Sequence, residues 1–289
     1  MIIVTGATGA LNGATVEHLL TRTPATDLVV VARNPAAAQH FADRGVAVRH
    51  GDYARPETLT AAFAGADQLL LVSSSDQRAD AVALHSAAID AAVSAGVGRV
   101  LYTSHQGASP RTTFGPGRDH AATEALLDAC GLPWTSLRNG FYAHSLTWLT
   151  GDWRSTGVIP VPGDGPVSWT AREDAAEAAA IIISALAAGE RGLEGPLTVT
   201  AAEAPTFEEV AAIASDVAGH RIQRTLVEPE EWVSAQVGAG RPEFVARFTL
   251  GMYQAAEQGY FAATSPLLTD LLGRTPKTVH QALQAPPSH

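Results

Sequence analysis

The fold is decided by Ile2-Ile3-Val4-Thr5-Gly6-Ala7-Thr8-Gly9-Ala10-Leu11-Asn12-Gly13, a β-branched run that enters a glycine turn. Residues 14–20, which follow it, are apolar at helical spacing. Gly6 permits backbone angles that other residues avoid, and Gly9 lets the backbone approach a phosphate closely. Amide groups at the start of a helix would meet the phosphate charge. The stretch therefore predicts a site for a dinucleotide pyrophosphate, formed by Gly6, Ala7, Thr8, Gly9, Ala10, Leu11 and Asn12.

Strand-like and helical patterns alternate through the first half of the chain. Strands are predicted at residues 2–5, 28–32, 47–50, 68–72, 99–103 and 134–137, and helices near 14–20, 35–44, 56–63, 79–95 and 119–130. This alternation is typical of βαβ units, so we expect an α/β fold with a doubly wound parallel sheet, the Rossmann fold. Ligands of such sheets bind beyond the carboxyl ends of the strands. Besides the glycine turn, the residues expected at that rim are Arg33, Ser73, Ser74, Ser75, Ser104, His105, Asn139 and Gly140.

The second half of the chain has a looser pattern. Residues 157–166 are rich in turn formers, and they are followed by a predicted helix at 174–188, a strand at 197–200, and helices around 207–218 and 229–237. We expect a dinucleotide-binding domain over residues 1–150, to which 171–200 return. Residues 151–170 and 201–289 should form a smaller C-terminal lobe that covers the substrate.

Composition excludes several classes of protein. Of 289 residues 46% are hydrophobic, and the formal net charge of −10 offers no basic surface for nucleic acid or an anionic membrane. No apolar run approaches the roughly 18 residues of a membrane span, so a cytoplasmic protein is expected. The single cysteine, Cys130, excludes an internal disulfide. No His-x-x-x-His or Cys-x-x-Cys spacing predicts a metal site.

The residue after the second strand bears on the choice of dinucleotide. NAD sites usually place an acidic residue there, whereas this chain has Arg33. A guanidinium can pair with a 2′-phosphate, which favours NADPH and leaves NAD(H) as the alternative. Asp52 and Tyr53, after the third strand, suit an adenine edge. A solvated loop at Arg33 and a simple turn at Asp52 are the alternative interpretations.

Lys277 is the only lysine of the chain, so no Tyr-x-x-x-Lys pair exists to protonate a carbonyl oxygen. Hydride transfer to an aliphatic ketone gives an alkoxide with a pKa near 16, whereas a quinone gives a phenolate-like anion near 10. The difference is about 8 kcal/mol at 1.36 kcal/mol per pKa unit. We therefore expect an electron-poor, conjugated aromatic acceptor, and we assign no catalytic residue. His105, His120 and His144 are alternative proton donors, each also explained as a surface or packing residue.

Several segments carry a family resemblance. They are Thr5-Gly6-Ala7-Thr8-Gly9, Val31-x-Arg33-Asn34-Pro35, Gly51-Asp52-Tyr53, Ser73-Ser74-Ser75, Tyr102-Thr103-Ser104, Leu137-Arg138-Asn139-Gly140-Phe141-Tyr142 and Thr170-x-Arg172. Together they resemble the NmrA-like atypical short-chain dehydrogenases, and within that family the group of type 2 quinone oxidoreductases and triphenylmethane reductases.

The resemblance implies a role for each matching segment. The turn from Gly6 to Leu11 would wrap the pyrophosphate, Arg33 would meet the 2′-phosphate, and the serines from Ser73 to Ser75 would line the nicotinamide ribose. The segment from Asn139 to His144, together with Arg172, would close the nicotinamide side. Aromatic walls for a flat substrate are expected from Phe141, Tyr142 and Trp169, with His105 and His144 beside them.

One departure from the family pattern concerns Asn12, which stands where the family has glycine. A helix packed close to the first strand leaves no room for a side chain at that position. Either Asn12 turns outward or the helix is slightly displaced.

Two other functions are consistent with the same residues. One is a redox-sensing protein that binds NAD(P) without turnover, and the other is a tailoring enzyme for an anthraquinone-type aromatic polyketide. The sequence leaves assembly open, with a homodimer as one outcome.

Overall fold

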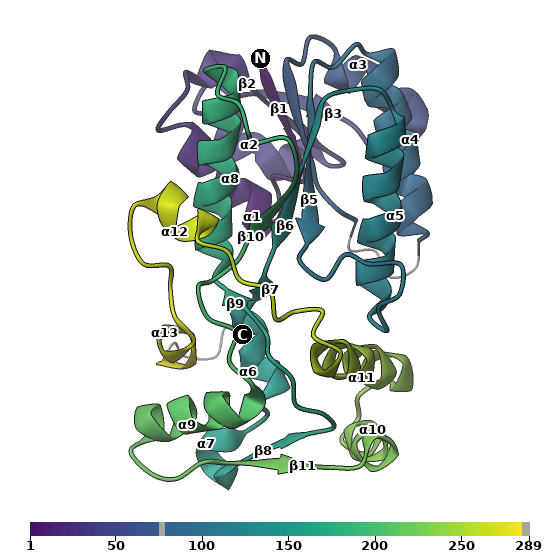
Figure 1. The fold of residues 1–289 in the computed structure, drawn as a ribbon. Helices are drawn as coiled ribbons and strands as arrows, with labels where there is room; N and C mark the ends of the chain where they lie inside the picture. The colour runs from purple at the N-terminus through teal and green to yellow at the C-terminus, as the bar shows by residue number, and fades with distance from the viewer. Residues whose placement is uncertain (75–78, 285–289) are drawn as a thin grey trace. The chain divides into compact units, whose positions relative to one another are not determined.

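The computed structural model describes residues 1–74 and 79–284 (Figure 1). Its central element is a parallel sheet of seven strands in the order β10-β6-β5-β4-β1-β2-β3. The order places β1 between β2 and β4, so the chain builds one half of the sheet outward from β1 and then crosses back to build the other. This confirms the predicted doubly wound α/β fold. The strands are β1 (Ile2–Thr5), β2 (Leu28–Ala32), β3 (Ala47–His50), β4 (Gln68–Leu71), β5 (Val100–His105), β6 (Trp134–Asn139) and β10 (Gly195–Val199).

Helices cover both faces of this sheet, with α3, α4 and α5 on one face and α1, α2 and α8 on the other (Figure 1). Alternate strand residues such as Val29, Val31 and Leu69 form a buried core with Phe63 and Ile89 because successive side chains of a strand point to opposite faces. The helices are α1 (Ala10–Leu19), α2 (Gln39–Ala42), α3 (Leu59–Phe63), α4 (Ala81–Ser94), α5 (Gly115–Ala129) and α8 (Arg172–Ala187), with 3₁₀ turns η1 (Ala25–Asp27), η2 (Pro35–Ala38) and η3 (Pro56–Thr58).

The chain divides into two compact units. Unit 1 consists of residues 1–104, 119–138 and 175–197, and unit 2 of residues 105–118, 139–174 and 198–289. This division differs from the expected one because residues 105–118, 139–150, 171–174 and 198–200 fall in unit 2. Segments that leave the ends of β5 and β6 therefore contribute to the second unit.

Unit 2 contains two small parallel sheets. In one, β7 (Phe141–Tyr142) pairs with β9 (Trp169–Thr170), and in the other β8 (Val158–Val161) pairs with β11 (Gln223–Leu226). Its core includes Phe207, Tyr253 and Phe261. The remaining elements are η4 (Ala143–Ser145), α6 (Leu146–Leu149), α7 (Trp153–Thr156), α9 (Phe207–Ala218), α10 (Pro229–Gly238), α11 (Glu243–Glu257), α12 (Leu267–Leu272) and α13 (Val279–Gln284).

Several elements differ from the sequence predictions, among them α1, β8 and α11. Helix α1 begins at Ala10, four residues before the expected start at residue 14. The stretch 157–166, read as turns, contains β8. Helix α11 was not predicted, because its buried face includes small and polar residues such as Ala246, Thr249 and Ala256. Within the described residues, no helix combines the length and apolar character needed to cross a membrane.

Candidate cofactor and acceptor residues

The predicted phosphate loop joins β1 to α1. Gly6 has a φ of +65°, and a Cβ there would lie 2.5 Å from Cγ1 of Val72. The amide of Gly9 donates to the carbonyl of Gly6 over 2.9 Å, which closes the turn. Gly9 is also the N-cap of α1 and offers no side chain to the first amides of that helix. Thr8, Gly9 and Ala10 are exposed, so the N-terminus of α1 is open to an anion.

The structure corrects one expectation for Asn12. The side chain does not turn outward, since it is 1% exposed and its Nδ2 donates to the carbonyl of Thr5 over 2.8 Å. The close approach of helix and loop occurs one residue later. A Cβ at Gly13 would lie 2.8 Å from the carbonyl oxygen of Ala7, which leaves no room for a side chain. Gly13 therefore provides the close contact that the family pattern assigns to the previous position.

Arg33 follows the last residue of β2 directly and is exposed. It makes no ion pair within residues 1–74 and 79–284. The neighbouring strand is in register, with Ala32 paired to His50. The guanidinium is thus available for an anionic ligand at the carboxyl end of β2.

Asp52 and Tyr53 have local partners. The carboxylate of Asp52 accepts from the amide of Ala54 over 3.0 Å and lies 3.5 Å from Nε of Arg55. The hydroxyl of Tyr53 lies 2.7 Å from Oγ1 of Thr5, and burial raises its pKa. Tyr53 is therefore directed toward the end of β1, and Asp52 sits in a tight turn.

Two of the predicted serines follow β4. The amide of Ser73 donates to Oγ1 of Thr103 over 2.8 Å, and the amide of Ser74 donates to Nε2 of His85 over 2.7 Å. Sequence reasoning missed His85. Its signal was a histidine one turn before the buried residues Ala88 and Ile89 of α4. Ser75 lies outside the described residues.

Ser104 is buried at 4% exposure, and its hydroxyl donates to Oε1 of Glu124 over 2.7 Å. The same oxygen accepts from Ser136 Oγ over 2.6 Å and from Arg138 Nε over 3.0 Å. Ser104 is thus part of an internal polar cluster of unit 1.

In unit 2, His105 is surrounded by aromatic rings. Its ring centroid lies 5.4 Å from that of Phe141 and 5.3 Å from that of Phe261, both edge-on. Nδ1 accepts from the amide of Gly107 over 3.0 Å, so the neutral ring carries its proton on Nε2. Burial lowers the pKa of His105 to about 4. The imidazole is therefore uncharged at neutral pH.

The end of β6 is tightly packed. Asn139 is 3% exposed, and its Oδ1 has no hydrogen-bond partner in the described part of the chain. A Cβ at Gly140 would lie 2.1 Å from Oγ1 of Thr170, so only glycine fits there. Trp169 is 1% exposed and packs edge-on against Phe141, with ring centroids 5.5 Å apart.

Tyr142, His144 and Arg172 form a second cluster of unit 2. Nη2 of Arg172 donates to Nε2 of His144 over 2.5 Å, and the rings of Tyr142 and His144 stack with centroids 5.7 Å apart. The Arg172 guanidinium carbon lies 5.4 Å from the Tyr142 ring centroid. Burial and the Arg172 charge lower the pKa of His144, while burial raises that of Tyr142. The arrangement offers one cation beside an aromatic pair.

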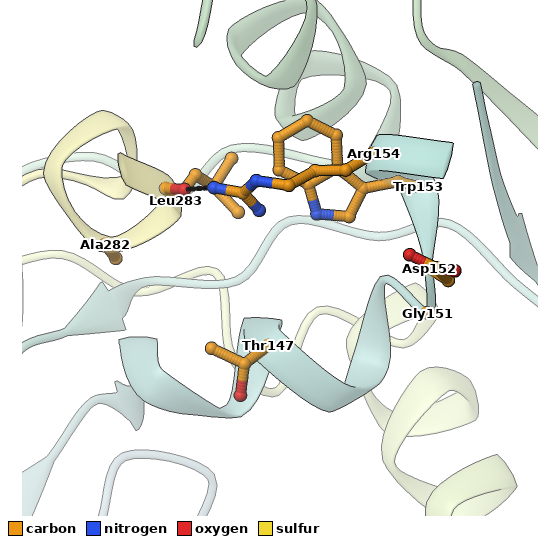
Figure 2. A pocket seen from close by; sticks show the side chains of 7 residues that line it. All are labelled: Thr147, Gly151, Asp152, Trp153, Arg154, Ala282 and Leu283. Carbon is orange, nitrogen blue, oxygen red and sulfur yellow. Dashed lines mark hydrogen bonds between the residues drawn. The ribbon is translucent and has the colours of Figure 1, made fainter. Parts of the chain in front are cut away.

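Figure 2 shows a separate pocket of unit 2, with a volume of about 320 Å³. Arg154 donates to the carbonyl of Leu283 and lies 4.2 Å from the Trp153 ring centroid. None of the predicted site residues lines this pocket. Across residues 1–74 and 79–284, no cluster of three histidine, cysteine or acidic side chains could hold a metal ion.

Comparisons with known proteins agree with the motifs. The model of the NmrA-like family matches residues 1–264. Quinone oxidoreductase 2 of Escherichia coli K12 is 34% identical over 98% of this chain and 97% of its own. NAD(P)H azoreductase of Xenophilus azovorans is 31% identical over 99% of this chain and 97% of its own.

A solved structure extends the likeness. Triphenylmethane reductase of Citrobacter sp., crystallised with NADP(H), is 33% identical and superposes with a TM-score of 0.87 over 98% of this chain and 99% of its own. The length and identity of these matches confirm the resemblance seen in the motifs. The chain belongs to the NmrA-like family.

Proposed function

We propose that this protein is an NADPH-dependent oxidoreductase that reduces a quinone-like or other conjugated aromatic acceptor. The observation that carries the proposal is the phosphate loop, in which Gly6 and Gly13 leave no room for a Cβ and α1 begins with open amides. Such a loop fits a pyrophosphate. Relatives crystallised with NADP(H) or NADPH lend support.

Arg33 supports the phosphorylated cofactor over NADH. Its guanidinium is exposed, follows β2 directly and has no ion-pair partner among the described residues. A charge-assisted pair with the 2′-phosphate would stabilise bound NADPH and leave NADH unaffected. We assign the nicotinamide ribose to Ser73, Ser74 and Ser75 and the adenine edge to Asp52. Ser104 stays a weaker candidate because Glu124 occupies its hydroxyl.

The class of acceptor is proposed from which side chains could donate a proton to it. When bound, NADPH would supply a hydride. The chain then has to stabilise or protonate the anion that forms on the acceptor. His105 is neutral at pH values well above 4, and Nε2 of His144 accepts from Arg172. Neither imidazole holds a readily transferred proton, so an acceptor that forms a weakly basic anion is favoured over an aliphatic ketone.

Unit 2 supplies the residues proposed for the acceptor and the nicotinamide end. Tyr142, which is half-buried, offers aromatic surface for a flat ring system, and the buried ring of Phe141 packs against that of His105 in the same unit. Arg172 beside Tyr142 could stabilise a developing phenolate charge, and Asn139 and Gly140 are assigned to the nicotinamide side. Trp169 would hold the Phe141 ring in place, because the two rings pack edge-on. Names of relatives include quinone, azo and triphenylmethane reductases.

The test is NADPH consumption by the purified protein with a simple quinone, a triarylmethane dye and an aliphatic ketone. Quinone or dye should react faster than the ketone by several powers of ten if most of the 8 kcal/mol difference enters the barrier. Equal rates with the ketone would overturn the proposal that the acceptor is reduced without a proton donor from this chain. Binding of NADPH without consumption would instead favour a redox sensor. A preference that rises with ring number would favour an anthraquinone tailoring enzyme.

A further inference from the structure

His85 lies on α4 in unit 1 and is 1% exposed. Both ring nitrogens have partners of known direction. The amide of Ser74 can only donate, so Nε2 of His85 accepts over 2.7 Å and carries no proton. Nδ1 therefore carries the proton and faces Oγ1 of Thr123 at 2.8 Å, and that hydroxyl donates to the carbonyl of Asp119 over 2.8 Å. The chain of hydrogen bonds has one consistent direction, from Ser74 to Asp119.

The neutral ring is the only protonation state that fits this arrangement. A second proton on Nε2 would face the amide hydrogen of Ser74. The titratable groups near the ring are the hydroxyl of Tyr102, 3.5 Å from Nδ1, and the carboxylate of Asp80 at the N-cap of α4. On α5, Nδ1 of His120 lies 2.8 Å from the same Tyr102 hydroxyl. Burial lowers the pKa of His85 to about 4, against a small opposing effect of Asp80.

Two consecutive amides after β4 are thus held by side chains from inside unit 1. Thr103 on β5 accepts from Ser73, and His85 on α4 accepts from Ser74. The path of the chain at Ser73 and Ser74 therefore depends on two side chains from separate elements.

We propose that His85 is a positioning residue that fixes the backbone at Ser74 and so places Ser73 and Ser74 for the ribose of the nicotinamide half of the cofactor. The inference rests on the proposed function, which assigns that ribose to these serines. His85 itself would not touch the cofactor. Its effect on binding passes through one hydrogen bond to the Ser74 amide.

A pair of substitutions separates this role from packing. In His85→Gln, the side-chain oxygen can reach the position of Nε2 and accept from Ser74. In His85→Asn, the shorter amide can still donate toward Thr123 but cannot reach Ser74. Both remove the imidazole and its titration. Thr123→Val is the matched control, because it removes the partner of Nδ1 and leaves the contact with Ser74.

The measurements are the dissociation constants of NADPH and NADH, KM and kcat with a quinone, and the melting temperature. His85→Asn should raise both dissociation constants about tenfold, whereas His85→Gln and Thr123→Val should stay within about threefold of wild type. A purely structural role would lower the melting temperature of all three variants and would affect binding by the Gln and Asn variants alike. That result would overturn the inference.

A second measurement serves if His85→Asn does not fold. Affinity of wild type for NADP⁺, which survives acid better than NADPH, should weaken relative to that of His85→Gln as the pH falls from 6.5 to about 3.5, below the pKa of His85 near 4, and a constant ratio over that range would refute the proposal. Wild-type protein that binds no NADPH would refute the proposed function itself. Normal wild-type binding with equal affinity in the Asn variant would refute only the role of His85.

Discussion

Replacement of Gly13 by alanine should weaken cofactor binding more than it weakens the fold. A Cβ at this position lies 2.8 Å from the carbonyl oxygen of Ala7, and real Cβ atoms essentially never come within 3.0 Å of such a neighbour. The atom that must move belongs to the backbone of the phosphate loop, and no flexible side chain can yield in its place. The substitution therefore displaces the amides proposed to meet the pyrophosphate.

The magnitudes follow from two opposing effects. Overpacking costs about 1–3 kcal/mol, and the preference of alanine over glycine in a helix offsets about 1 kcal/mol. The free energy of unfolding should then fall by about 0–2 kcal/mol. Loss of one charge-assisted hydrogen bond to the phosphate costs about 1.5–3 kcal/mol, which raises the NADPH dissociation constant roughly tenfold to a hundredfold.

Gly238 provides the matched control. It is the last residue of α10, and no heavy atom lies within 4 Å of a Cβ placed there. Gly238→Ala should raise the free energy of unfolding by up to about 1 kcal/mol and leave NADPH binding unchanged. Urea unfolding and fluorescence titration measure both quantities. If Gly13→Ala behaves as Gly238→Ala does in both assays, the reasoning from close contact is refuted.

Three further predictions concern unit 1. Arg33→Ala should weaken NADPH binding by about 1.5–3 kcal/mol and spare NADH in parallel titrations, and equal losses would remove Arg33 from the 2′-phosphate site. Asn12→Gly should leave cofactor affinity unchanged or slightly tighter because Nδ2 faces the Thr5 carbonyl, and a large loss would show direct contact with the cofactor. The buried neutral His85, with a pKa of about 4, binds fewer protons when folded than when unfolded. Its contribution to the free energy of unfolding is complete above the unfolded pKa of about 6.5 and should fall by about 3 kcal/mol as the pH drops toward 4. Urea unfolding at several pH values measures this loss. The prediction is wrong if wild type and His85→Gln show the same pH dependence.

The sheet could be predicted because its strands are short apolar runs between turn formers. All residues of β1, β2 and β4 are buried, as expected for strands covered on both faces. The start of α1 could not be predicted, because Asn12 and Gly13 are poor helix formers. The hydrogen bond from Asn12 to the Thr5 carbonyl compensates for that weakness, and the close approach of Ala7 requires glycine at position 13.

The candidate site was predictable only where its residues are close in sequence. The contact of Ser74 with His85 spans 11 residues, and that of His85 with Thr123 spans 38. No local spacing in the sequence predicts this series of hydrogen bonds. In unit 2, β8 pairs with β11 across more than sixty residues, with Val158 opposite Gln223. Short strands joined over such separations leave no periodic pattern to recognise.

The cluster around Glu124 has a consequence for evolution. One carboxylate oxygen accepts from Ser104, Ser136 and Arg138, which come from two strands. A change at Glu124 would leave three buried or half-buried donors unsatisfied, so these four positions should vary together among relatives, with strong epistasis between them. If relatives retain serine at position 104, its hydrogen bond to Glu124 is then a sufficient reason, without any selection for cofactor binding.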